Sequence, residues 1–161
     1  MNASGLKTYQ TNGLIVMRIL IGWHFLYEGV LKVYNPLWTA KGYLLSADGF
    51  LKTFFVNLSS DTFIGAVDFL NIVALILVGV GLLLGYAERL VSWIGIMLLV
   101  LYYLAHPAFP GLEQVNVEGN YWFVNKNLIE AAALYVLSIL PTGHLFGISR
   151  LFYSDPKTQT N

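Results

Sequence analysis

Long apolar stretches separated by polar segments dominate the chain, at residues 14–34, 62–86, 90–105 and 121–140. A helix needs about 20 mainly apolar residues to cross the hydrocarbon of a bilayer. We therefore predict an all-α fold in which four transmembrane helices form one antiparallel four-helix bundle, with residues 1–161 as a single domain. The third stretch is short, but aromatic side chains near its ends are typical of the headgroup region.

The segment between the first two spans, residues 35–61, has a different pattern. Pro36 ends the first helix, and apolar clusters then alternate with Lys41, Asp48 and Lys52. This pattern favours short helices that lie in the membrane interface. We expect these interfacial helices to cover the mouth of the bundle.

The other polar segments predict no further domain. Residues 106–120 contain two prolines and two glycines and indicate a turn-rich loop. In residues 141–161, Gly143 is expected to stop the last helix, followed by a short helical segment and a disordered end. The first apolar stretch is too long for a signal peptide, is interrupted by charges and has no cleavage site behind it, so we expect it to remain in the mature protein.

Composition agrees with a multi-pass membrane protein in contact with the lipid bilayer. Hydrophobic residues make up 57% of the chain and charged residues only 11%, which is rare in a soluble domain. The chain has no cysteine, which excludes disulfides, thiolate metal sites and Cys-x-x-Cys redox chemistry. A net charge of zero without a basic run gives no footprint for nucleic acid. No helix carries His, Asp or Glu at metal-ligand spacing, so we predict no metal site.

Basic residues give a weak indication of orientation. With four spans both termini lie on one side of the membrane, and loops rich in Lys and Arg favour the cytoplasm. The terminal side has Lys7, Arg18, Arg89, Arg150 and Lys157, and the opposite side has Lys32, Lys41, Lys52 and Lys126. We therefore predict cytoplasmic termini.

The first apolar stretch contains four ionisable residues, Arg18, His24, Glu28 and Lys32. At about 100° per residue they fall within one sector of about 120° of the helix surface. A charge near the bilayer centre costs about 2.5–3.5 kcal/mol on insertion scales, so this sector is expected to face the other helices. Glu28 precedes Lys32 by four residues, which is the favourable order for an ion pair within a helix.

Carboxylates in three different spans lie at a similar depth. Counted from the side away from the termini at about 1.5 Å per residue, Glu28, Asp68 and Glu130 are roughly 8 to 14 Å inside their helices. Intramembrane carboxylates are costly and usually functional, so we expect them to share one site. Other polar side chains near the same mouth are Lys32, His106, Lys126 and Asn127. The sequence thus predicts a polar pocket that opens away from the termini.

Several of these residues also have a structural interpretation. Glu28 and Lys32 would then form an ion pair that only fixes helix packing. Arg18 would reach a headgroup or a helix end. His24 beside a carboxylate is suited to proton exchange near neutral pH, or is a hydrogen-bonded core histidine. His106, which precedes a proline, would cap the third span.

The glycines Gly81 and Gly85 have the spacing of small residues at close helix contacts. Two interpretations follow from this spacing. The glycines either let helices approach inside the bundle or form a contact with a second copy of the chain.

Four segments resemble the DoxX/DoxD family. In "MRILIGWHFLYEGVLKV", Arg18, Gly22, Phe25, Gly29 and Lys32 stand at the Arg, Gly, Phe, Gly and Lys positions of its first-helix pattern. The segments "WTAKGYLLSADGF", "GVGLLLGYAERL" and "NKNLIEAAALYVL" resemble its loop, second-helix end and fourth helix, in that order. Together they extend over most of the chain. The loop is most similar to that of DoxD-like members, which are described as the small membrane subunit of a thiosulfate:quinone oxidoreductase.

The resemblance implies a protein of a bacterial or archaeal inner membrane with a role in sulfur or redox metabolism, and quinone as the cofactor. It supplies no agreed catalytic residues. We therefore predict a membrane subunit linked to quinone-dependent oxidoreduction, in which the apolar bundle admits the isoprenoid tail. Aromatic side chains such as Trp23, Phe25 and Trp122 would pack the ring. The proton-transfer candidates are His24, Glu28 and Glu130, and the quinone-binding candidates are Arg18, Lys32, Asp68, His106, Trp122, Lys126 and Asn127.

Two other functions stay open at this point. The first is a non-catalytic membrane subunit that binds and positions a partner protein, its interior charges serving assembly. The second is a small-molecule transporter, which with four short helices would need a homo-oligomer to make a path. A protein partner or a homo-oligomer is expected in each case.

Overall fold

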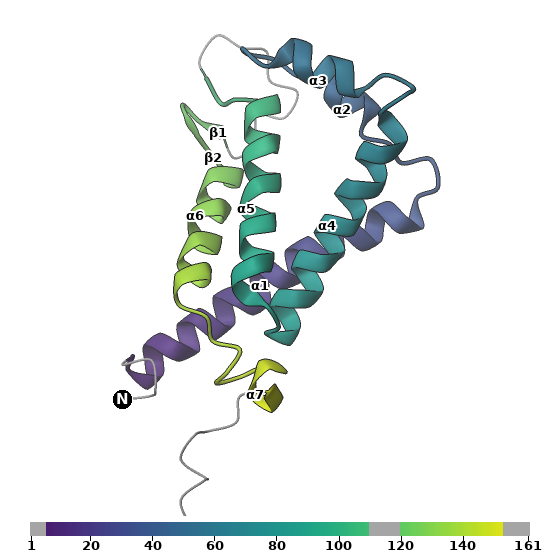
Figure 1. Ribbon diagram of the computed structural model, residues 1–161. Coiled ribbons are helices and arrows are strands. Elements are labelled where there is room, and N and C mark those ends of the chain that lie inside the picture. The colour runs from purple at the N-terminus through teal and green to yellow at the C-terminus, as the bar shows by residue number, and fades with distance from the viewer. Residues whose placement is uncertain (1–5, 110–119, 153–161) are drawn as a thin grey trace, which may run out of the picture.

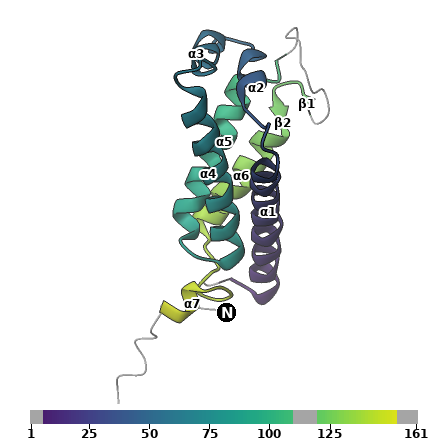
Figure 2. The same ribbon diagram turned by 90° about the vertical axis from the view of Figure 1, so that its right-hand side faces the viewer.

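The computed structural model describes residues 6–109 and 120–152, which are mostly helical as predicted (Figure 1). The elements in chain order are α1 (Thr8–Tyr34), α2 (Lys41–Leu45), α3 (Lys52–Leu58), α4 (Ile64–Leu84), α5 (Glu88–Ala105), β1 (Asn120–Tyr121), β2 (Val124–Asn125), α6 (Lys126–Ile139) and α7 (Ser149–Phe152). The start of α1 and α7 lie at one end of the molecule, and α2, α3 and the hairpin lie at the other (Figures 1 and 2).

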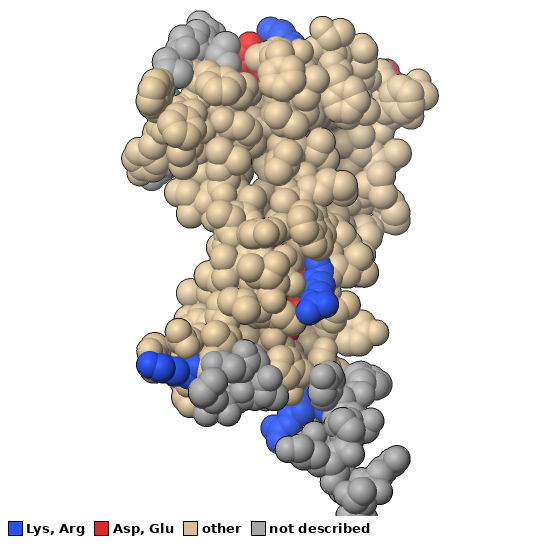
Figure 3. Space-filling view, turned by 60° about the vertical axis from the view of Figure 1, so that its left-hand side comes forward, with Lys and Arg blue, Asp and Glu red and all other residues tan. Residues whose placement is uncertain are grey.

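Three helices in the described part of the chain, α1, α4 and α5, are long and apolar enough to cross a membrane. They correspond to the first three predicted spans, although α1 already begins at Thr8. On the face drawn in Figure 3, charged residues lie mainly toward the two ends, and most of the surface between them is uncharged. This distribution suits a chain in contact with a lipid bilayer.

The predicted fourth span, residues 121–140, is wrong as one continuous helix. Its first residues form the hairpin, in which Asn120 pairs with Asn125 and Tyr121 with Val124. Trp122, at the hairpin turn, has a φ of 62°, and the Asn125 side chain accepts a hydrogen bond from Leu128 N at 3.1 Å and so caps the helix start. α6 therefore has 14 residues and a length of about 21 Å, shorter than the roughly 30 Å of hydrocarbon.

The long helices pack as two close pairs. α1 packs extensively against α4 and α5 against α6, whereas α1 and α6 make few contacts. Gly22, Gly29 and Gly79 lie where α1 meets α4, and a Cβ atom on Gly22 would be 3.0 Å from Leu82 Cβ. The main hydrophobic core consists of Phe25, Leu75, Val78, Leu82, Val91, Leu98, Leu99, Ala131, Leu134 and Leu137.

The glycines of the predicted small-residue pair serve packing within the chain. A Cβ atom on Gly81 would be 2.6 Å from Val91 in α5. Gly85 ends α4 with a φ of 63°, a left-handed conformation that glycine adopts without steric cost. Tyr86 N then donates to Gly81 O at 2.9 Å and Gly85 N to Leu82 O at 3.2 Å, which is the Schellman pattern of a helix end.

Residues 35–61 form the predicted short helices, α2 and α3, at the end opposite α7 (Figures 1 and 2). We call residues 35–61 the lid. Its apolar side chains pack with the ends of α4 and α5 in a second core of Ala40, Leu44, Ala47, Phe55 and Ala105. Ala40 N donates to Asp68 Oδ1 at 2.8 Å, and Asp48 N donates to Ala105 O at 2.9 Å. The lid is therefore attached to both α4 and α5.

Some predictions concern residues outside the described part of the chain. Most of the turn-rich loop, at residues 110–119, lies outside it, and so do the expected disordered end and Lys157, at residues 153–161. The orientation of the termini stays a prediction.

Candidate functional site

A cavity of about 690 Å³ lies between the long helices on the lid side. α1, α4, α5 and α6 all contribute to its wall, and α2 covers it. The lining residues are His24, Phe25, Glu28, Lys32, Trp38, Thr39, Ala40, Gly42, Tyr43, Ser46, Asn71, Leu75, Leu99, Tyr102, His106, Asn125, Lys126 and Asn127. Six of the ten predicted site residues are among them, namely His24, Glu28, Lys32, His106, Lys126 and Asn127.

The charges at the cavity form two pairs and leave one lysine over. Lys32 Nζ lies 2.7 Å from Glu28 Oε2, in the predicted pairing. His24 Nδ1 lies 2.7 Å from Glu130 Oε1, which connects α1 to α6 and brings Glu130 to the cavity edge. Lys126 has no carboxylate partner within the described residues. The lining therefore carries a local positive charge that favours an anionic or electron-rich ligand group.

Aromatic and amide side chains form the wall between α4 and α5. Asn71 Nδ2 donates to Tyr102 Oη at 2.7 Å, and Tyr43 Oη donates to the Tyr102 carbonyl at 3.0 Å. The Tyr43 and His106 rings lie 4.3 Å apart between centroids, and His106 Nε2 lies 3.1 Å from Ser46 Oγ. This network links the lid to both spans.

Two polar atoms of this wall are buried without a hydrogen-bond partner in the described residues, Asn71 Oδ1 and His106 Nδ1. Buried polar atoms are usually satisfied, and an unpartnered one costs about 1–3 kcal/mol. Turning the Asn71 amide over would leave its nitrogen unsatisfied instead of its oxygen. Unpartnered groups at the wall of a cavity are suited to bind a ligand that both donates and accepts hydrogen bonds.

Burial determines the protonation states of Tyr43 and His106, on the lid side of this wall. It raises the pKa of Tyr43 well above its ordinary value, with a smaller contribution from Tyr102, so the phenol stays a neutral donor. Burial also lowers the pKa of His106 from 6.5, against the smaller opposite effects of a hydrogen bond to Ser46 and the charge of Asp48. The His106 ring is therefore neutral at pH 7.

The floor of the cavity is apolar. Leu75 follows Asn71 by one helical turn, and Leu99 precedes Tyr102 by one turn, so both lie below the polar wall. Phe25 completes the floor, and all three belong to the main hydrophobic core. Trp38 is at the lid side, with Lys32 Nζ 5.4 Å from its ring centroid. The cavity is thus apolar at depth and charged at its rim.

Arg18 lies at the opposite end of the molecule, which corrects its assignment to the ligand site. Its side chain is fully buried, and Nη1 contacts Glu88 Oε1 at 2.8 Å and Thr142 Oγ1 at 2.9 Å. Nη2 donates to Phe146 O at 2.6 Å, while Nε has no partner within the described residues. These contacts are structural, but they are not the predicted contact with a headgroup or a helix end, because Arg18 is fully buried and pairs with the Glu88 carboxylate.

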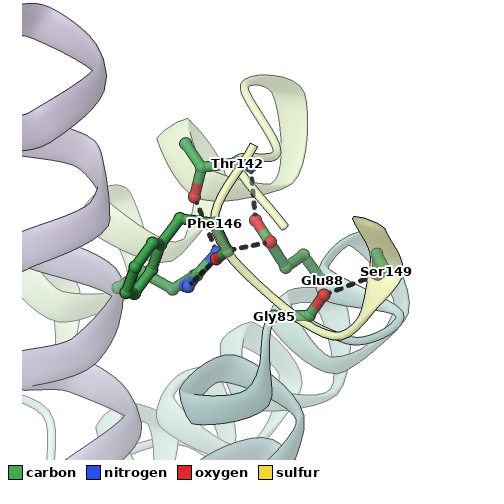
Figure 4. A network of polar contacts seen from close by, with 6 residues as sticks. Gly85, Glu88, Thr142, Phe146 and Ser149 are labelled. Atoms are coloured by element: carbon green, nitrogen blue, oxygen red, sulfur yellow. Dashed lines mark hydrogen bonds and ion pairs between the residues drawn. The ribbon is translucent and has the colours of Figure 1, made fainter. Parts of the chain in front are cut away.

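The same network fixes the segment after α6, as the labelled residues of Figure 4 show. Thr142 N donates to Glu88 Oε2 at 2.8 Å, and Ser149 Oγ donates to Gly85 O at 2.5 Å. We call the residues Arg18, Gly85, Glu88, Thr142, Phe146 and Ser149 the terminal network. It joins α1, the α4–α5 turn and the C-terminal segment.

Asp68 and Trp122 are also corrected. The Asp68 carboxylate is not part of the cavity lining, but it accepts the hydrogen bond from the backbone N of Ala40, which is, and so anchors the lid beside the cavity. Trp122 is 71% exposed at the hairpin turn, away from the cavity lining. Of the aromatic residues expected to pack a ring, only Phe25 lines the cavity, since Trp23 is exposed on the outer face of α1.

Sequence reasoning missed Asn71, Tyr102, Tyr43 and Glu88. Asn71 had a readable signal, because it is an amide within a strongly apolar stretch and follows Asp68 by three residues. Glu88 had a signal too, because it follows Gly85 by three residues and so belongs to the terminal side, where the sequence also predicts Arg18. The tyrosines gave no signal that separates them from interfacial aromatics.

No group of three or more His, Asp or Glu residues in residues 6–109 and 120–152 is arranged to hold a metal ion. Comparisons of the chain with protein-family models, with curated proteins and with solved structures found no match. The resemblance to the DoxX/DoxD family stays a prediction from the segments quoted above.

Proposed function

We propose that this chain is the membrane subunit of a quinone-linked oxidoreductase and that its cavity binds the quinone head group. The observation that carries the proposal is a cavity of about 690 Å³ with an apolar floor, an aromatic wall and two unpartnered polar atoms. Small-molecule pockets typically measure about 300–1,000 Å³ and are mainly apolar with a few converging polar groups. The DoxX/DoxD resemblance also supports a quinone-linked membrane subunit. We further propose that α6 completes a four-helix bundle within an inner membrane.

The ring system of a quinone fits the lining. Its flat apolar face suits the floor of Phe25, Leu75 and Leu99, and its oxygens suit the polar wall. The oxidised head group accepts hydrogen bonds and the reduced one also donates them. Asn71 presents an amide that can supply either partner, and the neutral His106 ring can do the same.

The chain contributes protons and charge stabilisation. Reduction of a quinone to a quinol takes up electrons and protons in equal number, and a partner subunit with a redox cofactor supplies the electrons. His24, held through Nδ1 by Glu130, keeps Nε2 for proton exchange at the cavity. Lys126 stabilises negative charge that develops on a ring oxygen. Lys32 is held by Glu28 and acts at the rim.

The test uses the purified chain in lipid nanodiscs, titrated with decylubiquinone and followed by quenching of tryptophan fluorescence, to which the cavity residue Trp38 contributes. We expect Glu130→Gln to weaken binding by at least about tenfold, equivalent to 1.4 kcal/mol, with little change in the thermal midpoint. Gln preserves the shape but cannot hold His24 as a charged partner does. Asp61→Asn is the matched control, because it removes an exposed carboxylate that pairs with Lys41 outside the cavity.

The alternative function, a subunit that only positions a partner protein, predicts a different result. In that case the double variant Glu28→Gln/Lys32→Met, which removes both members of the rim pair, keeps both stability and partner binding. It would show no dependence on quinone. A natural chain that fails to quench with decylubiquinone contradicts the quinone proposal directly.

A further inference from the structure

The described residues below the cavity are tightly packed. Phe25 is 2% exposed, and Val78 and Leu134 are fully buried beneath the floor. A Cβ atom on Gly95 would lie 2.8 Å from Leu134 and 3.4 Å from Phe25, so the helices are in close contact there. Protein interiors packed in this way leave no channel for a flexible chain. A tail that leaves the cavity through this packed region would have to separate the helices, so we look for its path elsewhere.

The lid closes the opposite side of the cavity. Ala40 and Asp48 anchor it through backbone hydrogen bonds to α4 and α5, and Tyr43 binds the Tyr102 carbonyl. The pair formed by Lys41 and Asp61 adds a contact at 2.7 Å near the start of α4. A tail that left the cavity on this side would have to disrupt these contacts and then enter water.

The seam between α1 and α6 is different. The two helices make few contacts, although both line the cavity, α1 through His24 and Glu28 and α6 through Lys126 and Asn127. Their main polar link is the contact between His24 and Glu130, and the His24 side chain is 51% exposed. Trp23 and Tyr27, stacked at 6.3 Å, are exposed beside it on the outer face of α1.

We propose that this seam is a lateral opening, so that the ligand is a lipid-dissolved amphiphile whose ring occupies the cavity and whose apolar tail passes between α1 and α6 into the bilayer. This inference rests on the proposed function and adds how the ligand enters and what shape it has. The His24–Glu130 pair spans the opening and must separate or shift for the tail to pass. A second copy of the chain covering the seam is the competing arrangement, and the test includes it.

The natural absence of cysteine makes the seam testable by cross-linking. The variant His24→Cys/Glu130→Cys is treated in nanodiscs with a short bifunctional methanethiosulfonate reagent. It lacks the His24–Glu130 pair and binds decylubiquinone more weakly than the natural chain from the start, so cross-linked and capped samples are compared only with each other, at concentrations that reach this weaker affinity. The reference is the same variant capped with the monofunctional methyl reagent, which blocks both thiols without joining the helices. The control variant, Trp93→Cys/Tyr135→Cys, joins α5 to α6 at an outward-facing ring contact with centroids 6.2 Å apart.

Each sample is titrated with decylubiquinone and with the tail-less ring compound 2,3-dimethoxy-5-methyl-1,4-benzoquinone. We expect cross-linking of the seam to weaken decylubiquinone by at least about tenfold while the tail-less compound stays within about twofold of the capped sample. The control cross-link should affect neither compound. Selective loss of the tailed compound is the result that a general distortion of the cavity would not give.

Equal binding of decylubiquinone by the cross-linked and capped samples overturns the lateral opening and leaves the proposed function intact. Failure of the natural chain to bind either compound overturns the proposed function and the lateral opening with it. If the reagent joins two chains, seen as a dimer on a denaturing gel, the seam is an interface between copies and the inference is wrong.

Discussion

Helix α1 supplies ionisable side chains to both ends of the molecule, and the two ends differ in how these side chains are surrounded. Arg18 is fully buried in the terminal network and is held by Glu88, Thr142 and Phe146. Ten residues further along, Glu28 is 44% exposed and its partner Lys32 lines a cavity. Charge in a span therefore indicates a polar environment without distinguishing a closed packing contact from an open site.

The difference lies in what the neighbouring helices contribute. At the terminal end, the α4–α5 turn and the segment after α6 bring a carboxylate, a hydroxyl and a carbonyl to one guanidinium. At the cavity end, the side chains of α1 meet their partners in pairs, and atoms of Asn71 and His106 have no partner within the described residues. Arg18 Nε is also unpartnered within the described residues, but Arg18 does not line the cavity, so unpartnered groups indicate a ligand site only where they border a cavity.

The largest effect that we expect is on the free energy of unfolding, and it compares one ion pair from each end of the molecule. Glu88→Gln leaves the Arg18 charge buried without its counter-ion, and breaking such a pair costs about 3–5 kcal/mol of unfolding free energy. Glu28→Gln removes one member of a half-exposed pair and should cost less than about 1 kcal/mol. Equilibrium denaturation in micelles, followed by circular dichroism, measures both.

Arg89→Gln is the control for this comparison, since it removes a neighbouring charge of α5 that is exposed. Its effect should be within about 0.5 kcal/mol, the usual range for surface substitutions. Similar losses for Glu88→Gln and Glu28→Gln would contradict the distinction between the two ends.

A second, intermediate effect concerns the contact that holds α1 between the two ends. A Cβ atom on Gly79 would clash with the backbone of Leu26, so Gly79→Ala should force α1 away from α4. We expect a loss of about 1–3 kcal/mol, typical of overpacking. Gly65→Ala in the same helix has no atom within 4 Å of the added carbon and should be neutral or slightly stabilising. If thermal denaturation gives both variants the same midpoint, the α1–α4 contact is looser than described.

The sequence was sufficient for the three long helices and for the shared face of α1, because hydrophobicity and a period of about 3.6 residues are local properties. It was also sufficient for the lid helices, since Pro36 and the apolar clusters that follow it are readable. The start of α6 was readable too, because Asn125 is a good cap, yet the continuous apolar pattern of residues 121–140 concealed it.

The placement of the site depended on long-range contacts that the sequence does not encode locally. The depth of Asp68 along its helix does not show that the lid supplies its partner. Asp68 lies in the second turn of α4 and binds the lid backbone at Ala40. Arg18 pairs with Glu88, 70 residues away in the chain. Its other partners, Thr142 and Phe146, lie in the segment after α6. The pairing of His24 with Glu130 was within reach of the depth argument, but the weak packing between α1 and α6 was not.

The smallest effect that we expect is on the pH dependence of the thermal midpoint, which should also differ between the two ends of the molecule. Burial lowers the pKa of His106, at the cavity, from 6.5, so the folded chain resists protonation of this ring longer than the unfolded chain does. Its contribution to stability is complete above pH 6.5 and is lost as the pH falls through 6.5 toward the folded pKa. His106→Gln removes that dependence. The thermal midpoints of the natural chain and the variant should therefore converge as the pH falls from about 7.5 to about 5.5, the range in which histidine changes charge. Because His24 is present in both chains, the difference between their midpoints isolates the contribution of His106. The Glu88→Gln loss should not converge over this range, because none of the six residues of the terminal network is a histidine. A constant difference between the natural chain and His106→Gln at both pH values would mean that the ring is not held neutral, and that its unpartnered Nδ1 is not reserved for a ligand.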